Sequence, residues 1–102
     1  MPELTSLSNL TETPHAEVFD DDGEPRAVRL QLEADERIPE HRHPESDVIF
    51  QLLSGSLELS LDGEPYELES GDLVRFDGNR EVSPHALEES TAVVVFASKP
   101  KS

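Results

Sequence analysis

The clearest structural pattern in the chain is the segment SLELSLDGEPYEL, residues 56–68. Its three leucines alternate with polar residues, as expected of a strand that buries one face. The Asp62-Gly63 pair that follows is the strongest short-range signal for a hairpin turn. The segment therefore predicts two antiparallel strands joined by a tight turn.

Strand patterns continue on both sides of this hairpin. Residues 26–33 alternate in the same way, whereas residues 48–53 and 92–97 are nearly continuous apolar runs, which predicts strands covered on both faces. Shorter strands are expected at residues 73–76 and within residues 81–87, and no long segment has helical periodicity. About eight short strands spaced by roughly 8 to 12 residues are typical of an antiparallel sandwich or barrel.

The composition allows a single domain. Of the 102 residues, 34% are hydrophobic, which is close to the limit at which chains stay unfolded. Leu, Ile, Val and Phe still supply 27 residues, above the roughly 20% at which disorder becomes the default. We expect an N-terminal arm at residues 1–25 that could include an edge strand around residues 16–19, a barrel at residues 26–98 and a basic tail at residues 99–102.

The charge of the chain excludes several classes of partner. The 23 acidic residues against 8 Lys and Arg give a formal charge of −15, which repels phosphate backbones and anionic lipids. We therefore expect neither nucleic acid nor a membrane as a partner, and the absence of a signal-peptide pattern predicts a cytoplasmic protein. The acidic surface favours a halophilic protein, with an ordinary acidic protein as the alternative.

The segment IPEHRHPESD, residues 38–47, holds the residues best suited to chemistry. If it is extended, His41 and His43 point to the same face and form a chelating pair. Because the chain has no Cys, a metal site must use imidazole and carboxylate groups, and Asp47 is a candidate oxygen ligand. The alternative is that the pair lies in a polar surface loop. His15, in the arm, is expected to have no role in a site.

These residues resemble the first motif of the cupin superfamily. In that motif two His separated by one residue, a Glu three or four residues later and a Gly at the next turn line a small β-barrel; here His41, His43, Asp47 and Gly55 stand at these places. The segment that begins at Gly71-Asp72 is similar to the start of the second motif. The resemblance implies an all-β fold, an antiparallel jelly-roll β-barrel, over about residues 26–97.

The sequence departs from the cupin pattern at two ligand positions. One extra residue separates Asp47 from Gly55, so a bulge or a change of facing is expected, and Asp47 then points inward or misses the site. In the second motif Val82 stands where the third metal-binding His would fall, and His85 comes three residues later. An odd offset turns His85 outward unless the strand bulges near Pro84. The chain therefore has either a bulge with His85 as third ligand or a weak site with two His.

The resemblance implies two functions that the sequence leaves open. In the first, a divalent metal ion (Zn, Ni, Fe or Mn) is bound by His41 and His43, with Asp47 and His85 as further candidates, and an open position on the ion serves an enzyme that acts on a small organic molecule. In the second, the barrel is a non-catalytic module that binds or stores a small molecule, and the metal site is weak or lost. Neither motif contains a recognisable nucleophile or general base, and the fold does not choose between the two. A homodimer is expected, because barrel edges need to be covered.

Overall fold

The computed structural model describes residues 4–19 and 25–99, so most of the predicted basic tail lies outside the described residues. These residues form a short 3-10 helix, η1 (Leu7–Asn9), and eight strands. The strands are β1 (His15–Glu17), β2 (Arg26–Leu32), β3 (Ser46–Ser54), β4 (Ser56–Leu61), β5 (Glu64–Glu69), β6 (Leu73–Asp77), β7 (Val82–Ala86) and β8 (Ser90–Ser98). Within the described ranges no helix is long and apolar enough to cross a membrane.

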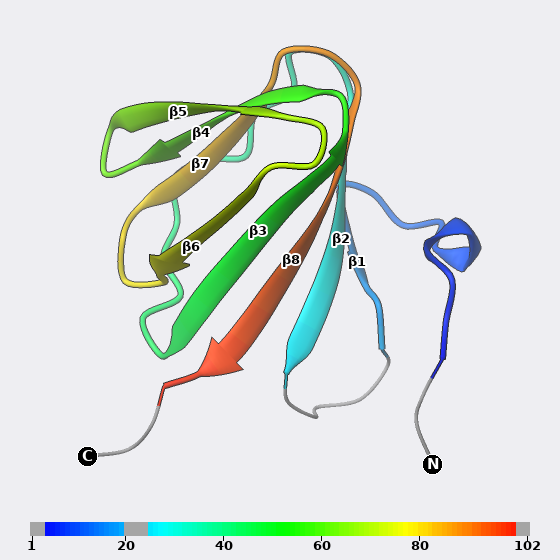
Figure 1. Ribbon diagram of the computed structural model, residues 1–102, viewed down its shortest axis with the longest axis horizontal. Helices are drawn as coiled ribbons and strands as arrows, with labels where there is room; N and C mark the ends of the chain where they lie inside the picture. The colour runs from blue at the N-terminus through cyan, green and yellow to red at the C-terminus, as the bar shows by residue number, and fades with distance from the viewer. Residues whose placement is uncertain (1–3, 20–24, 100–102) are drawn as a thin grey trace.

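The strands form two antiparallel sheets, which can be followed in Figure 1. The larger sheet has the order β1-β2-β8-β3-β6, and the smaller sheet has the order β5-β4-β7. The segment between β2 and β3 runs along β7 and pairs with it at two isolated bridges, Arg37 with His85 and His41 with Val82. The predicted all-β jelly-roll barrel is confirmed, and this extra pairing places the predicted His pair at the edge of the smaller sheet.

The β4–β5 hairpin forms as the sequence predicts. Leu57, Leu59 and Leu61 are at most 2% exposed and face the core. Asp62 and Gly63 connect the strands with φ angles of 53° and 85°, the positive values that a two-residue hairpin turn of type I′ requires. The buried leucines of this hairpin pack against apolar residues of the larger sheet in one continuous core.

The prediction that β3 is covered on both faces is wrong. Val48, Phe50 and Leu52 are almost fully buried, but Ile49 is 39% exposed on the opposite face. The smaller sheet packs against only one face of the larger sheet, so the outer face of β3 meets solvent. A continuous apolar run thus occurs in a strand that is buried on only one face.

The N-terminal arm covers one edge of the larger sheet. Its strand β1 pairs with β2 and places His15 opposite Leu30 and Ala16 opposite Arg29. Ala16 is buried, and Arg29, which is also buried, donates a hydrogen bond of 2.7 Å to the carbonyl oxygen of Glu12. The arm is thus part of the folded domain at this edge, and it places His15 beside Leu30 of β2.

Candidate binding cavity

A cavity of about 260 Å³ lies at the end of the barrel where β2 and β3 begin and β8 ends. Its floor is apolar and includes the buried residues Leu30, Phe50 and Phe76. The polar residues that line it are more exposed and lie at its mouth: His15, Arg26, His41 and His43. None of the described residues that line the cavity is acidic. The chain has 23 Asp and Glu residues, so the cavity differs from the rest of the protein in having no acidic residue among its described lining residues.

The predicted His pair lines this cavity. The rings of His41 and His43 are perpendicular, with an interplanar angle of 87° and centroids 4.8 Å apart. The His43 ring also packs edge-on against Phe96, with 4.6 Å between the centroids. The two imidazoles share one face because the segment is extended there, as period-two alternation predicts.

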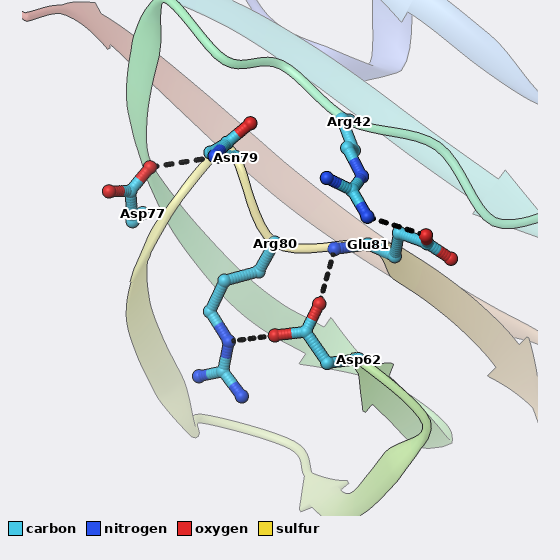
Figure 2. Close-up of polar contacts among 6 residues, drawn as sticks. All are labelled: Arg42, Asp62, Asp77, Asn79, Arg80 and Glu81. Carbon is cyan, nitrogen blue, oxygen red and sulfur yellow. Dashed lines mark hydrogen bonds and ion pairs between the residues drawn. The ribbon is translucent and has the colours of Figure 1, made fainter.

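Backbone hydrogen bonds hold the pair in place. His41 exchanges two bonds with Val82, of 3.1 and 2.9 Å, and the N–H of His43 donates to the carbonyl oxygen of Gly78 at 2.7 Å. Between them Arg42 faces outward and donates to Glu81 of the β6–β7 turn at 2.6 Å (Figure 2). This hydrogen bond lowers the pKa of Glu81 and raises that of Arg42. The outward ion pair and the inward imidazoles are two results of the same alternation.

Hydrogen bonds connect the β6–β7 turn to Asp62 of the β4–β5 hairpin (Figure 2). Asp62 accepts bonds from the Arg80 side chain at 2.8 Å and from the Glu81 N–H at 2.9 Å. Arg80 thus pairs with a neighbouring carboxylate rather than with the cavity. Gly78 is buried in this turn, and a Cβ atom there would lie 2.5 Å from the Ser46 carbonyl oxygen and still closer to that of His43. The close approach therefore requires glycine.

One hydrogen bond fixes the chemistry of the His41 ring. Its Nδ1 lies 3.0 Å from the carbonyl oxygen of Pro39. A carbonyl oxygen can only accept, so Nδ1 carries the proton, and in the neutral ring Nε2 keeps an unshared electron pair. This is the tautomer-setting contact that ligating imidazoles commonly make. His41 lines the cavity, and in this neutral tautomer Nε2 is its acceptor nitrogen.

The other ionisable groups at the mouth leave the cavity with little charge. Burial lowers the pKa of His43, and the neighbouring His41 lowers it further. The same two causes lower the pKa of His15, so the cavity favours the neutral form of both rings. Arg26 stacks on Phe96, 5.1 Å from the ring centroid, and pairs with Glu17 at 2.5 Å. The hydrogen bond from Arg26 lowers the pKa of Glu17, so this cation has an ionised partner.

His15 is a cavity residue that the sequence did not identify. It lines the cavity because β1 pairs with β2 in a register that sets it opposite Leu30, another cavity residue. A strand of three residues is too short to show a period-two pattern, so the sequence carried no signal for its facing. The expectation that His15 has no place in a site is corrected to this extent.

Asp47 does not join the His pair. It pairs with Asp77 and Ala97 across β3 and is exposed on the outer face, next to the inward Val48. The extra residue before Gly55 is accommodated by a register shift between Leu52 and Ser54, at the far end of the strand. The facing of Asp47 is therefore that of a regular strand.

His85 also lies away from the cavity. Strand β7 pairs regularly with β4 from Val82 to Ala86, and Val82 and Pro84 line the cavity, so His85 faces outward. There its Nε2 lies 3.4 Å from Asp35 and its Nδ1 3.5 Å from Arg37. Of the two arrangements that the sequence allows, the structure has the one without a bulge near Pro84.

The residues present do not fit a complete cupin metal centre. Two imidazoles bound to one ion at about 2.1 Å in adjacent positions have centroids roughly 5 Å apart, and the 4.8 Å between His41 and His43 agrees with this value. The position of the third metal-binding His in the cupin pattern is apolar here, because Val82 occupies it. Across residues 4–19 and 25–99, no group of three or more His, Cys, Asp or Glu is arranged to hold an ion. The pair alone would make a two-ligand site.

The comparisons with known proteins agree with this architecture. Residues 28–98 match the cupin domain family. The structure of KdgF from Halomonas sp. is similar, with a TM-score of 0.83 and 18% identity over 99% of this chain and 97% of that chain. TT1209 from Thermus thermophilus gives a TM-score of 0.79 and 19% identity over 97% and 100% of the two chains. An RmlC-like cupin protein from Desulfovibrio desulfuricans gives 0.75 and 18% over 95% and 96%. No curated protein sequence matches the chain.

Proposed function

The chain belongs to the cupin domain family, and we propose that it is a small-molecule-binding cupin whose ligand lies in the cavity beside His41 and His43. The observation that carries this proposal is the cavity itself, about 260 Å³ with an apolar floor and polar groups only at its mouth. Drug-sized ligands occupy cavities of about 300 to 1,000 Å³. A compact organic molecule is therefore the expected ligand.

Apolar and polar residues of the cavity would contribute to ligand binding in different ways. Leu30, Phe50 and Phe76 would remove the apolar body of the ligand from water, which is the main source of affinity. His41 and His43 would bind its polar end and fix its orientation. Because no carboxylate lines the cavity and no nucleophile lies beside the imidazoles among the described residues, binding without catalysis is the simplest function of this arrangement.

The proposal is tested by closing the cavity. Val94 lines it and is 9% exposed, so Val94→Phe would fill the space that a ligand needs. The matched control is Val95→Phe, one residue further along β8, where the side chain faces the outside of the sheet. We expect toluene and phenol to shift the NMR resonances of cavity residues in the wild type and in the control but not in Val94→Phe. Equal shifts in all three proteins, or none in any, would contradict the proposal.

A second candidate function is divalent-metal binding by His41 and His43. It is favoured by the 4.8 Å separation of the rings and by the proton on Nδ1 of His41, which leaves Nε2 as a ligand atom. With two nitrogen ligands the affinity for Zn²⁺ or Ni²⁺ should be weak, because catalytic zinc sites use three protein ligands. A metal-dependent enzyme would require this site to be occupied.

Metal analysis of protein purified without a nickel column tests the second candidate. Titration calorimetry with Zn²⁺ should show about one site in the wild type and none in the His41→Ala/His43→Ala variant. His85→Ala is the matched control, because His85 faces outward, and it should bind as the wild type does. A loss of binding in the control, or no binding in the wild type, would remove the pair as a metal site.

A further inference from the structure

We propose that the cavity selects neutral, compact molecules that carry a hydroxyl group, with the hydroxyl donating to Nε2 of His41. This inference rests on the proposed small-molecule function and names the class of ligand. It is carried by an acceptor nitrogen at the mouth of an apolar cavity and by the absence of acidic residues from the described lining.

The acceptor at Nε2 follows from the contact on the other side of the ring. Nδ1 donates to the carbonyl oxygen of Pro39, and Pro39 is held close by, since the neighbouring Ile38 N–H donates at 3.0 Å to the carbonyl oxygen of Pro84 and His41 is bonded to Val82 in both directions. The ring therefore cannot turn over without losing its bond to Pro39. Among the described residues no donor is in hydrogen-bond contact with Nε2. A ligand hydroxyl is the simplest group that supplies one.

A carboxylate is the less suitable head group. The cation at the mouth, Arg26, is already bonded to Glu17 through Nε and a terminal nitrogen. Nε2 of His41 repels an oxygen that carries only lone pairs. The chain's charge of −15 also disfavours the approach of an anion. The side chains that face this part of the cavity are thus an ion pair and imidazoles, which suit a neutral ligand.

The shape of the cavity orients the same ligand. The apolar floor residues are buried, whereas His41 and His43 in the same lining are only half-buried. A ligand with one polar end would place its body on Phe50 and Phe76 and its hydroxyl beside the imidazoles. A site that hydrogen-bonds a hydroxyl discriminates against the analogue that lacks it, because its polar group is then left unpaired.

Three probes of similar size test the assignment: phenol, toluene and benzoate, each titrated by NMR in the presence of EDTA so that no metal ion takes part. Toluene replaces the hydroxyl by a methyl group, and benzoate replaces it by an anion. In the wild type the ratio of the affinities for phenol and toluene includes the contribution of the hydrogen bond to Nε2 of His41. Comparing this ratio between variants cancels the difference in hydrophobicity of the probes.

The variant is His41→Phe, which keeps a ring and removes the acceptor, and the matched control is His85→Phe on the outer face of β7. We expect the preference for phenol over toluene to fall about three- to tenfold in His41→Phe, as the loss of one hydrogen bond predicts, and to stay unchanged in the control. Benzoate should bind more weakly than phenol. In the wild type, ¹⁵N NMR of the ring should show the proton on Nδ1 of His41, a result that does not depend on how the variant folds.

The outcomes separate this inference from the proposed function. If phenol and toluene bind and their ratio is the same in the wild type and His41→Phe, the hydroxyl assignment is wrong and the cavity still binds small molecules. Tighter binding of benzoate, or a His41 ring protonated on Nε2, also overturns the assignment. If none of the three probes binds, both proposals fail.

Discussion

Replacing Gly78 by Ala tests how the β6–β7 turn positions the candidate site. The turn touches the His43 segment through two backbone hydrogen bonds, from His43 to Gly78 at 2.7 Å and from Gly78 to Ser46 at 2.9 Å. A Cβ atom on residue 78 would lie 2.5 Å from the Ser46 carbonyl oxygen and closer to that of His43. Both oxygens belong to backbone, so no side-chain rotation relieves the clash.

The cost follows from this geometry. Ordinary contacts between carbon and a carbonyl oxygen are about 3.3 Å or longer, so the two segments must separate by about 1 Å. Both hydrogen bonds then exceed the range of about 2.7 to 3.2 Å and are lost, at about 0.5 to 1.5 kcal/mol each. Residual overpacking adds about 1 kcal/mol or more. The free energy of unfolding should fall by about 2 to 4 kcal/mol, a large part of the 5 to 15 kcal/mol that is usual for a domain.

Urea unfolding followed by circular dichroism measures this loss. The control is Gly63→Ala in the β4–β5 turn, where a Cβ atom meets nothing within 4 Å and only the φ of 85° is strained, at a cost of about 1 kcal/mol. Gly78→Ala should also shift the NMR resonances of the His43 ring, because its support moves. If Gly78→Ala costs no more than Gly63→Ala, the close approach of the turn to the His43 segment does not support the site.

The further predictions concern stability and oligomeric state. Because the pKa values of His43 and His15 are lowered in the folded state, the unfolded chain binds more protons, and the free energy of unfolding should fall as pH decreases through about 6.5. Urea unfolding at several pH values should show a smaller decrease for the His43→Gln variant than for the wild type. An equal decrease in both proteins would contradict this prediction. Leu59→Ala, at a core position with 0% exposure, should lower the free energy of unfolding by about 3 to 5 kcal/mol. Leu73→Ala, at a position with 62% exposure, should change it by no more than about 0.5 kcal/mol. Similar losses for both variants in thermal unfolding would refute the assigned core. If the protein is halophilic, its refolding should improve from low to molar salt, and equal stability in both would refute this interpretation. If it is a homodimer, sedimentation at molar salt should show a dimer, and a monomer would refute that interpretation.

The parts of the fold that the sequence predicts are those set by local patterns. The β4–β5 hairpin needs only alternating leucines and two residues that adopt positive φ, all within residues 56–68. The shared facing of His41 and His43 is equally local, because it depends on two residues of one extended segment. Where a prediction needed the layout of the whole sheet, as for the outer face of β3, the apolar run of residues 48–53 was misleading, since Ile49 is exposed.

The remaining site residues depend on strand register, which the sequence does not encode locally. His15 reaches the cavity only through the pairing of β1 with β2, and His85 faces outward only because β7 pairs with β4 without a bulge. A shift of one residue in either pairing would reverse the facing. The sequence could therefore state the two arrangements of His85 but not choose between them.

The facing of Asp47 shows how a distant contact settles such a choice. The strand contains one residue more than the cupin pattern, and the register shift that accommodates it lies between Leu52 and Ser54. Just beyond, Gly55 has a φ of 95°, and a Cβ atom there would meet Ser90 and the Glu89 carbonyl oxygen. Because this contact holds the end of β3 against the start of β8, we infer that the extra residue is most easily accommodated next to it. The first half of β3 then keeps a regular register, which turns Val48 toward the cavity and Asp47 toward solvent, and the site is left with imidazoles and no carboxylate among the described residues.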